Sequence, residues 1–393
     1  MSRVVLTLEQ RFEGTPDGRV WTPGPFGRAF WEQYLEVFDE VIVAARVRSV
    51  TSAREGAVEA TGRGISFVKL PDYHGPLQFL PRAARIRAMA LAAIGDGDSV
   101  ILRVPSAIGT LIAPRLVRRG IAFAIEIVGD PYDVFSPGAV RHPLRPFFRW
   151  KFARDLRNQA NAAVAAAYVT RRALQRRYPC PAFETHFSDV QLPDDPRPAH
   201  RSFSRRPLRL IHIGTFDQLY KAPDVLVDAV ARCVTQGVDL SLDLVGGGTY
   251  LDEIKRRVER HGIASRVRFA GYLSSRSALI ARLDESDLFV LPSRQEGLPR
   301  AMIEAMSRGL PCVGSTVGGI PELLDAEDLV QPGDVDALAQ KIGEIVSGAG
   351  RLQRMSMRNL ERVREYSPEQ LAMRRRAFYR FVLDATQKRV DAA

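Results

Sequence analysis

Residues 287–311 read DLFVLPSRQEGLPRAMIEAMSRGLP, a pattern typical of a buried strand followed by a loop and a helix. The first five residues are an almost wholly apolar run of the length that strands favour. Pro299 suits the first position of a helix, and Gly309 suits the position just past its end. Residues 312–316 predict a further buried strand. A strand, a helix and another strand in this order predict a parallel α/β sheet.

Two glutamates lie beside the loop of this unit. Glu296 is in the loop itself, and Glu304 follows eight residues later in the first turns of the helix. Loops after parallel strands gather at the edge of the sheet where ligands bind, and helix N-termini there attract phosphate. Because phosphate repels carboxylates, the pair favours a ligand that also carries hydroxyl donors, as a sugar nucleotide does. Taken from spacing alone, the alternative is a loop charge and an ordinary first-turn helix acid.

The segment from Glu296 to Glu304 resembles the E-x7-E region of retaining glycosyltransferases of the GT-B fold, family 4 type, also called group 1 glycosyltransferases. Residues 318–322, Gly-Gly-Ile-Pro-Glu, continue the resemblance. Three further features of the sequence, upstream of this segment, occur in the same order as in the family. They are the opening strand, glycine turn and lysine at 210–226, the second strand and glycine turn at 242–248, and the base-binding strand end at 267–272. The resemblance covers about residues 207–325, and the N-terminal half matches only loosely.

The resemblance implies roles for individual residues. Glu304 is expected to hold the ribose hydroxyls and Glu296 to contact the transferred sugar. Lys221 is expected to stabilise the diphosphate of the departing nucleotide, although a lone lysine is more commonly a plain surface residue. The remaining donor-binding residues that the resemblance implies are Gly214, Thr215, Tyr272, Leu273, Arg294, Gly297, Leu298 and Pro299.

The sequence departs from the family pattern at two places. Many relatives carry an arginine directly after the turn glycine, where this chain has Thr215. Either the threonine hydroxyl with backbone amides, or a cation such as Arg294 or Arg300, is expected to replace it. Relatives often place a histidine after the strand corresponding to 122–128, and the nearest counterpart here is Asp130. Asp130 is therefore a catalytic candidate that accepts a hydroxyl, with an Asp-Pro turn as the alternative.

Alternation of apolar runs and helical stretches predicts two Rossmann-like domains, each a doubly wound parallel sheet. The N-terminal domain is expected over residues 1–195 as the acceptor-binding half, with residues 11–18 on its acceptor side. The donor-nucleotide domain is expected over 200–367, after a proline-rich linker at 193–198. By the resemblance, the domains face a cleft and a C-terminal helix at 368–393 packs back on the first domain. The predicted strands are 4–8, 40–44, 65–70, 99–104, 122–128, 163–169, 208–213, 241–245, 266–269, 288–291, 312–315 and 329–331.

Composition is that of an ordinary globular enzyme. The 393 residues are 46% hydrophobic and 26% charged, which excludes a disordered chain. The three cysteines form no C-x-x-C pair, so the sequence favours a reducing compartment over a zinc site. The N-terminus lacks a signal-peptide pattern, and no uncharged apolar run approaches the ~20 residues that span a bilayer. We therefore expect a cytoplasmic protein.

Positive charge is concentrated in one segment. The net charge is +11, and residues 141–177 contain ten Lys or Arg but one acid, Asp155. Aromatic residues alternate with the cations over 143–152, a combination that suits an anionic membrane surface. The alternative is a solvated helix face with its rings turned to the core. Nucleic acid is not expected as a partner, because no base-reading motif accompanies the charge.

The sequence thus predicts a retaining hexosyltransferase that uses a UDP- or GDP-sugar. The expected acceptor is a hydroxyl of a lipid-linked glycan in exopolysaccharide or O-antigen synthesis at the inner face of the membrane, and a soluble acceptor stays open. No paired-aspartate metal motif is present, so Lys221 and a helix N-terminus are expected to do the electrostatic work without a metal or other cofactor. The alternatives are a GT-B sugar-nucleotide epimerase and a non-catalytic nucleotide-sugar-binding protein of the same fold.

Overall fold

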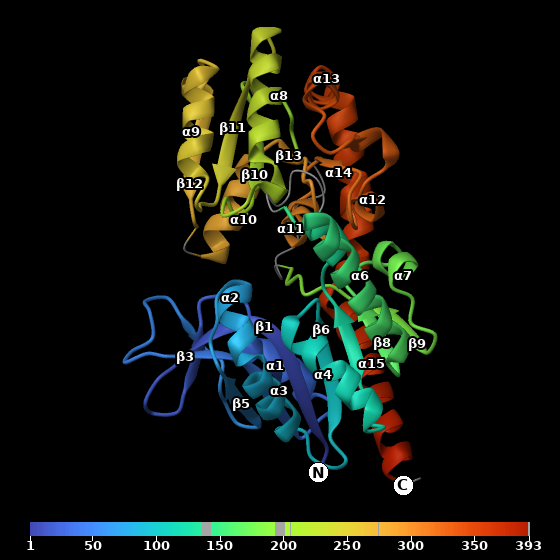
Figure 1. The fold of residues 1–393 in the computed structure, drawn as a ribbon. Coiled ribbons are helices and arrows are strands. Elements are labelled where there is room, and N and C mark those ends of the chain that lie inside the picture. The colour runs from blue at the N-terminus through green and yellow to red at the C-terminus, as the bar shows by residue number, and fades with distance from the viewer. Residues whose placement is uncertain (136–142, 193–200, 205, 274, 392–393) are drawn as a thin grey trace. The chain divides into compact units, whose positions relative to one another are not determined.

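The structure is a computed structural model that describes residues 1–135, 143–192, 201–204, 206–273 and 275–391. It divides into two compact units (Figure 1). Unit 1 consists of Met1–Pro131, Lys151–Phe187 and Ala372–Ala393, and unit 2 consists of Tyr132–Trp150 and Ser188–Leu371. Residues 132–150, placed in the N-terminal domain by sequence, therefore belong to unit 2. The predicted linker at 193–198 lies outside the described residues.

Unit 1 is built on a nine-stranded sheet with a parallel core. Its central strand, β1 (Arg3–Gly14), pairs in parallel with β3 (Glu40–Ser49) on one side and β6 (Ser99–Val104) on the other. The chain moves outward from β1 in both directions, so the strand order reverses there. The other strands of this sheet are β2 (Val20–Thr22), β4 (Val58–Glu59), β5 (Ile65–Leu70), β7 (Ala124–Ile127), β8 (Ala165–Tyr168) and β9 (Phe183–His186).

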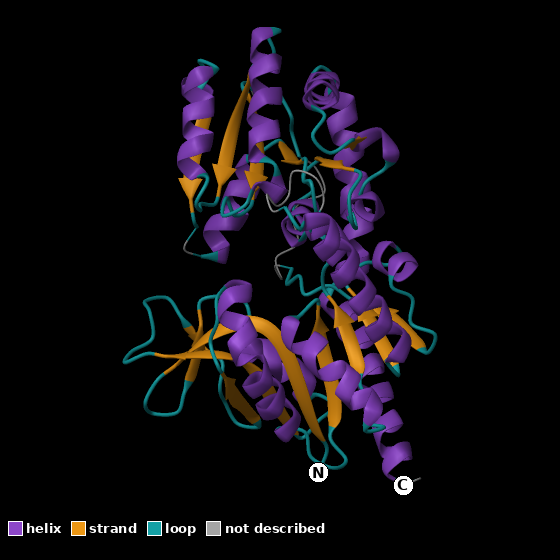
Figure 2. Ribbon diagram, in the orientation of Figure 1, coloured by secondary structure: helices purple, strands orange, loops and turns teal. Residues whose placement is uncertain are grey.

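Helices flank the strands of unit 1 (Figure 2). In α4 (Ala107–Arg118), the Ser106 side chain caps the N-terminus by accepting from Gly109 N at 3.1 Å, and buried apolar residues recur at helical spacing. Residues 372–390 of α15 (Pro368–Val390) also belong to this unit, and Tyr379 stacks on Tyr34 with ring centroids 4.5 Å apart. The remaining helices with residues in unit 1 are α1 (Arg28–Leu35), α2 (Gly75–Phe79), α3 (Ala83–Ala92), α5 (Pro131–Val134), α6 (Arg145–Ala162) and α7 (Ala173–Arg177).

Unit 2 contains a six-stranded, wholly parallel sheet in the order β12-β11-β10-β13-β14-β15. The chain fills one side from β10 to β12 and the other from β13 to β15, so the strand order reverses between β10 and β13. Ligands of open α/β sheets bind outside the carboxyl ends of the strands at such a reversal. The strands are β10 (Leu208–Ile213), β11 (Leu240–Val245), β12 (Val267–Gly271), β13 (Leu288–Leu291), β14 (Cys312–Ser315) and β15 (Leu329–Val330).

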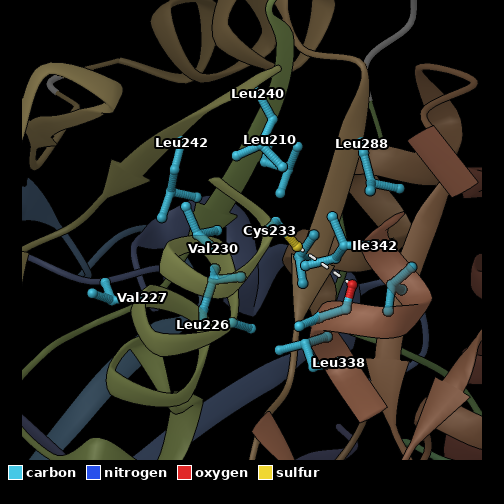
Figure 3. Close-up of a cluster of buried hydrophobic side chains, with 14 of the residues drawn as sticks. Leu210, Leu226, Val227, Val230, Cys233, Leu240, Leu242, Leu288, Leu338 and Ile342 are labelled. Carbon is cyan, nitrogen blue, oxygen red and sulfur yellow. Dashed lines mark hydrogen bonds between the residues drawn. The ribbon is translucent and has the colours of Figure 1, made fainter. Parts of the chain in front are cut away.

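The core of unit 2 lies between this sheet and its helices (Figure 3). Leucines of the strands, among them Leu210 and Leu288, lie near Val230 and Cys233 of one helix and Ile342 of another. Cys233 behaves as a small apolar residue whose thiol donates to Ala339 O at 3.4 Å. The helices that lie wholly within unit 2 are α8 (Pro223–Thr235), α9 (Leu251–Arg260), α10 (Arg276–Glu285), α11 (Arg300–Ser307), α12 (Ile320–Leu323), α13 (Val335–Val346) and α14 (Ala349–Val363).

The fold class predicted from the sequence is confirmed: both units are parallel α/β sheets flanked by helices. Cys312 is buried in β14, as its apolar surroundings in the sequence indicate. Within the described part of the chain, no helix combines the length and the hydropathy needed to span a bilayer.

Candidate active site

The candidate site of unit 2 forms where β10 and β13 end. The loop after β10 leads into a short 3-10 turn, η2 (Leu219–Lys221), which carries Lys221. The loop after β13 carries Glu296. Lys221 Nζ donates to Glu296 Oε1 at 2.5 Å, although 75 residues separate the two in sequence. The two residues that the sequence assigned to the diphosphate and the sugar therefore meet at the reversal of strand order.

The Lys221–Glu296 ion pair is largely buried, and further hydrogen bonds fix the position of the Glu296 carboxylate. The Lys221 side chain is 16% exposed and that of Glu296 6%. Ser293 Oγ donates to the same Oε1 of Glu296 at 2.8 Å. Ser315 Oγ in turn donates to the Ser293 carbonyl at 2.5 Å. A chain of hydrogen bonds from β14 thus fixes the carboxylate at the end of β13.

Two glycines permit close backbone contacts around this pair. At Gly214, an added Cβ would lie 2.9 Å from Lys221 Cγ, so the lysine stem lies directly against the turn. Gly318 has a φ of +52°, and a Cβ there would lie 2.1 Å from the carbonyl oxygen of Glu296. Both positions therefore require glycine, because a side chain would displace one member of the ion pair.

Arg294, one of the cations expected to replace the family's arginine, is paired with a carboxylate. Its two terminal nitrogens donate to the two carboxylate oxygens of Asp224 at 2.7 and 2.8 Å. One of them also donates to Leu219 O at 2.8 Å. The guanidinium group therefore ties the loop after β13 to the turn that carries Lys221. The other candidate cation, Arg300, is exposed at the first position of α11.

Glu304 lies on α11 and is half-buried. Among the residues that the structure describes, its carboxylate has no hydrogen-bond or ion-pair partner. Burial raises its pKa above the ordinary value of 4.5, and Arg300 and Arg276 oppose that shift only in part. A half-buried carboxylate without a partner can accept hydrogen bonds from hydroxyl groups of a ligand.

The loop between the two glutamates leads directly into α11. Gly297 O accepts from Gly319 N at 2.6 Å, which joins this loop to the one before α12. Leu298 is buried, and Pro299 directly precedes the helix. No side chain caps α11 at Pro299, so its first amide groups and positive dipole end are available to an anion.

The expected base and phosphate contacts after β12 and β10 form a second cluster. Tyr272 is 69% exposed, and its hydroxyl donates to Gly247 O at 2.7 Å. Leu273 follows it and is half-buried. The Thr215 hydroxyl donates to Asp217 Oδ2 at 2.8 Å. Thr215 is therefore already bound to a carboxylate that the sequence analysis did not single out.

His212 is a further residue at this site that sequence reasoning missed. It is fully buried in β10, and Nδ1 lies 3.0 Å from Val290 O. Its Nε2 has no hydrogen-bond partner in the described part of the chain, and lies 3.5 Å from where a Cβ of Gly214 would be. Burial lowers the pKa of His212 to about 4, so the ring is neutral at pH 7. A polar residue inside an apolar strand run was the available signal.

Asp130 lies in unit 1, in the loop after β7. It is buried, forms an ion pair with Arg177 and accepts from the Tyr178 hydroxyl at 2.5 Å. The carboxylate therefore has a cation and a hydroxyl as partners within unit 1, and neither of the two alternatives for this residue included an ion pair.

Glu9 marks the carboxyl edge of the sheet in unit 1, and sequence reasoning missed it. It lies in β1 where the pairing with β3 shifts register, between Thr7 and Arg11. Its carboxylate accepts from Ser106 Oγ and Ala107 N, both at 3.0 Å, and from the Tyr73 hydroxyl. Burial and the neighbouring Glu9 raise the pKa of Tyr73. An acid following the apolar run at 4–8 was the available signal.

Comparison with known proteins finds sequence similarity to glycosyltransferases. Residues 207–347 match the family described as glycosyl transferases group 1. The chain is 24% identical to Protein CapJ of Staphylococcus aureus over 352 residues, which are 89% of this chain and 88% of that protein. It is 31% identical to the putative colanic acid biosynthesis glycosyltransferase WcaL of Salmonella typhimurium over 162 residues, which are 38% of this chain and 39% of that protein.

Solved structures share the fold over almost the whole chain. Sucrose-phosphate synthase from Thermosynechococcus elongatus matches with a TM-score of 0.71 and 18% identity over 98% of this chain and 100% of that one. HepE from Anabaena, in complex with UDP-glucose, matches with a TM-score of 0.60 and 15% identity over the whole of both chains. Two parallel α/β units with this likeness define the GT-B fold. Residues 207–347 of the chain are thus similar to the group 1 glycosyltransferases.

Proposed function

We propose that this chain is a retaining hexosyltransferase that moves a hexose from a UDP- or GDP-sugar to a hydroxyl acceptor. The observation that carries the proposal is the meeting of Lys221 and Glu296 at the reversal of strand order in unit 2. Glu304 supports it, because a half-buried carboxylate without a partner suits the ribose hydroxyls. The likeness to HepE, which was solved with UDP-glucose, favours a uridine donor.

In the proposed reaction, the bond between the anomeric carbon and the leaving phosphate oxygen breaks. The acceptor oxygen forms the new bond on the same face of the sugar, and its proton passes to that phosphate oxygen. Lys221 and the first amides of α11 stabilise the negative charge that grows on the diphosphate. Glu296 orients the sugar through its hydroxyls. These groups carry the electrostatic work, and we propose that the reaction needs no metal.

We further propose that the acceptor is a lipid-linked glycan and that α6 brings the enzyme to an anionic membrane. Phe147 and Trp150 are 50% and 56% exposed on this helix. Arg154 and Arg157 continue the same exposed stripe, since the four residues recur at helical spacing. Exposed rings beside cations suit a bilayer interface with anionic headgroups. Asp130 and Glu9 lie at the carboxyl edge of the sheet in unit 1. We propose that the acceptor binds at this edge.

The test combines purified protein with UDP-glucose, UDP-N-acetylglucosamine or GDP-mannose and a lipid-linked sugar acceptor. Release of the nucleoside diphosphate that depends on the acceptor supports transfer, and NMR of the new anomeric carbon checks retention. Conversion of the donor without an acceptor would instead indicate an epimerase. Binding of nucleotide with no turnover under any acceptor would indicate a binding protein of the same fold.

A further inference from the structure

The ion pair between Lys221 and Glu296 joins two groups that the donor must separate. The proposed donor needs the ammonium group for its diphosphate and the carboxylate for its sugar. In the structure each group neutralises the other at 2.5 Å. We propose that this pair, called here the donor latch, makes the enzyme discriminate between an intact sugar nucleotide and a bare nucleoside diphosphate. This inference rests on the proposed function of the site.

Burial makes the donor latch effective. Both side chains are mostly removed from water, so their attraction is screened much less than that of a surface pair. A nucleoside diphosphate that draws Lys221 toward its phosphates brings negative charge toward Glu296 and weakens the hold of the cation on it. A buried carboxylate that loses its cation is strongly unfavourable.

The sugar of an intact donor removes this penalty. Its hydroxyl groups are hydrogen-bond donors, and a carboxylate accepts such bonds through both oxygens. Glu296 therefore exchanges one partner for others when the whole donor binds. With the diphosphate alone, it retains the hydrogen bond from Ser293 and gains nothing.

Neighbouring groups restrict the other ways of relieving Glu296. Arg294 cannot readily replace Lys221, because Asp224 already binds both of its terminal nitrogens. The carboxylate is also held in place, because Ser293 donates to it and Ser315 fixes the Ser293 backbone. Ser293 is thus a positioning residue that keeps Glu296 in the site after Lys221 turns to the phosphates.

The donor latch also favours release of the nucleoside diphosphate product. After transfer, the sugar no longer contacts Glu296, and the carboxylate again competes with the diphosphate for Lys221. The nucleoside diphosphate is therefore expected to be a weaker ligand than the donor from which it came.

Calorimetric titration of the full chain tests the latch with UDP and UDP-glucose, and with GDP and GDP-mannose, without an acceptor. Wild type is expected to bind the sugar nucleotide more tightly than the matching diphosphate. In Glu296→Gln, the diphosphate is expected to bind about tenfold more tightly than in wild type, because Lys221 is released from a charged partner. The preference for the sugar nucleotide over the diphosphate is then expected to shrink, because neither complex leaves a buried carboxylate without its cation.

Two further variants make the result specific. Glu304→Gln keeps the latch but alters the proposed ribose contact, so both ligands are expected to weaken by the same factor. Ser293→Ala leaves Glu296 more dependent on Lys221, so the diphosphate is expected to weaken several-fold while the sugar nucleotide changes less. Circular dichroism and melting of each variant without ligand confirm that it folds.

The possible outcomes distinguish failure of the donor latch from failure of the proposed function on which it rests. An unchanged ratio of the two affinities in Glu296→Gln, with both ligands bound by wild type, overturns the latch and leaves the donor site intact. Wild type that binds none of these ligands overturns the proposed donor site itself. A shift of Ser293→Ala in the same direction as Glu296→Gln overturns the positioning role of Ser293.

Discussion

The Lys221 side chain lies across the glycine turn at Gly214, and this placement determines what the residue can do. A flexible surface lysine loses much conformational entropy when it orders around a ligand. Here the stem already packs against the turn and the ammonium group is held by Glu296. The side chain is therefore largely ordered without a ligand, although the proposed donor has to draw the ammonium group away from Glu296.

Removing either member of the pair should reduce turnover without unfolding the protein. Lys221→Ala and Glu296→Ala are each expected to lower kcat/KM about 100-fold, the size typical for loss of one stabilising group at the reacting centre. Lys255→Ala is the matched control, since this lysine is 45% exposed on α9 of the same unit. Steady-state kinetics check the prediction, and near-normal turnover in both variants would contradict it.

The charged carboxylate of Glu304 is expected to lower the free energy of unfolding at neutral pH. Burial raises its pKa, so the folded protein holds the proton more tightly than the unfolded chain does. The carboxyl group therefore destabilises the fold as the pH rises above 4.5, its ordinary pKa. Glu304→Gln should raise the melting temperature by about 2 °C at pH 7.

Melting curves of this variant and wild type between pH 4 and pH 7 check the sign. The difference should shrink as the pH falls toward 4.5. A lower melting temperature of Glu304→Gln at pH 7 would show instead that the carboxylate is stabilised by a partner.

Sequence reasoning anticipated the chemical types at this site but not their pairings. Lys221 and Glu296 were assigned to different parts of the donor, and their mutual ion pair depends on the neighbouring positions of β10 and β13. The same holds for Arg294, which is 70 residues away from Asp224 in sequence. Such contacts require the strand order, and a single sequence does not provide it.

Among the elements of unit 1, β6, β7, α1 and α15 meet at one buried carboxylate. Glu126 accepts from Arg103 at 2.6 Å, and the two side chains are 2% and 7% exposed. Tyr34 donates to it at 2.9 Å, and Tyr379 from α15 approaches it at 3.4 Å. The charge pair lies inside the unit, where a lost partner leaves an uncompensated ion.

Substitution of this carboxylate should have a much larger effect than substitution of a surface one. Glu126→Ala is expected to lower the free energy of unfolding by about 3–5 kcal/mol, and Tyr379→Phe by about 1 kcal/mol. Glu32→Ala serves as the control, because its ion pair with Arg28 is half-exposed and worth about 0.5 kcal/mol. Urea unfolding measures all three, and equal effects would rule out a special role for Glu126.

The lengths of the elements were harder to predict than their existence. The strand at 65–70 is observed as predicted, whereas the strand predicted at 4–8 extends through Arg3–Gly14. The extension is polar and contains the register shift beside Glu9, so it lacks the apolar run used for prediction. Its partner β2 adds antiparallel pairing at Glu13 and Gly14, a contact set by tertiary structure.

For the whole molecule, the exposed stripe of α6 is the feature that bears on location in the cell. Exposed clusters of large apolar side chains often mark surfaces of interaction. Phe147 and Trp150 lie 6.1 Å apart by ring centroids, so they form one continuous apolar surface. In the proposed docking, cations on the same helix are expected to add attraction to anionic lipid that weakens with salt.

Loss of these rings should weaken binding to membranes. The double variant Phe147→Ser and Trp150→Ser is expected to reduce binding to phosphatidylglycerol vesicles at least about tenfold, because burial of one such side chain contributes about 1.5–3 kcal/mol. Met357→Ser is the control, since Met357 is 56% exposed on α14. Vesicle co-sedimentation at low and high salt measures the effect, and equal binding by all variants would contradict the proposed docking.

Unit 1 is assembled from three segments, one before unit 2, one between its two segments and one after it. Its interior includes Phe378, Tyr379 and Val382, which follow every residue of unit 2 in sequence. A ribosome therefore completes unit 2 before it has supplied the last helix of unit 1. Until then Tyr34 and Glu126 lack their aromatic partner from α15, and the emerging polypeptide exposes apolar surface that chaperones bind. Unit 2 should therefore reach its folded state before unit 1, although the first segment of unit 1 is synthesised earlier.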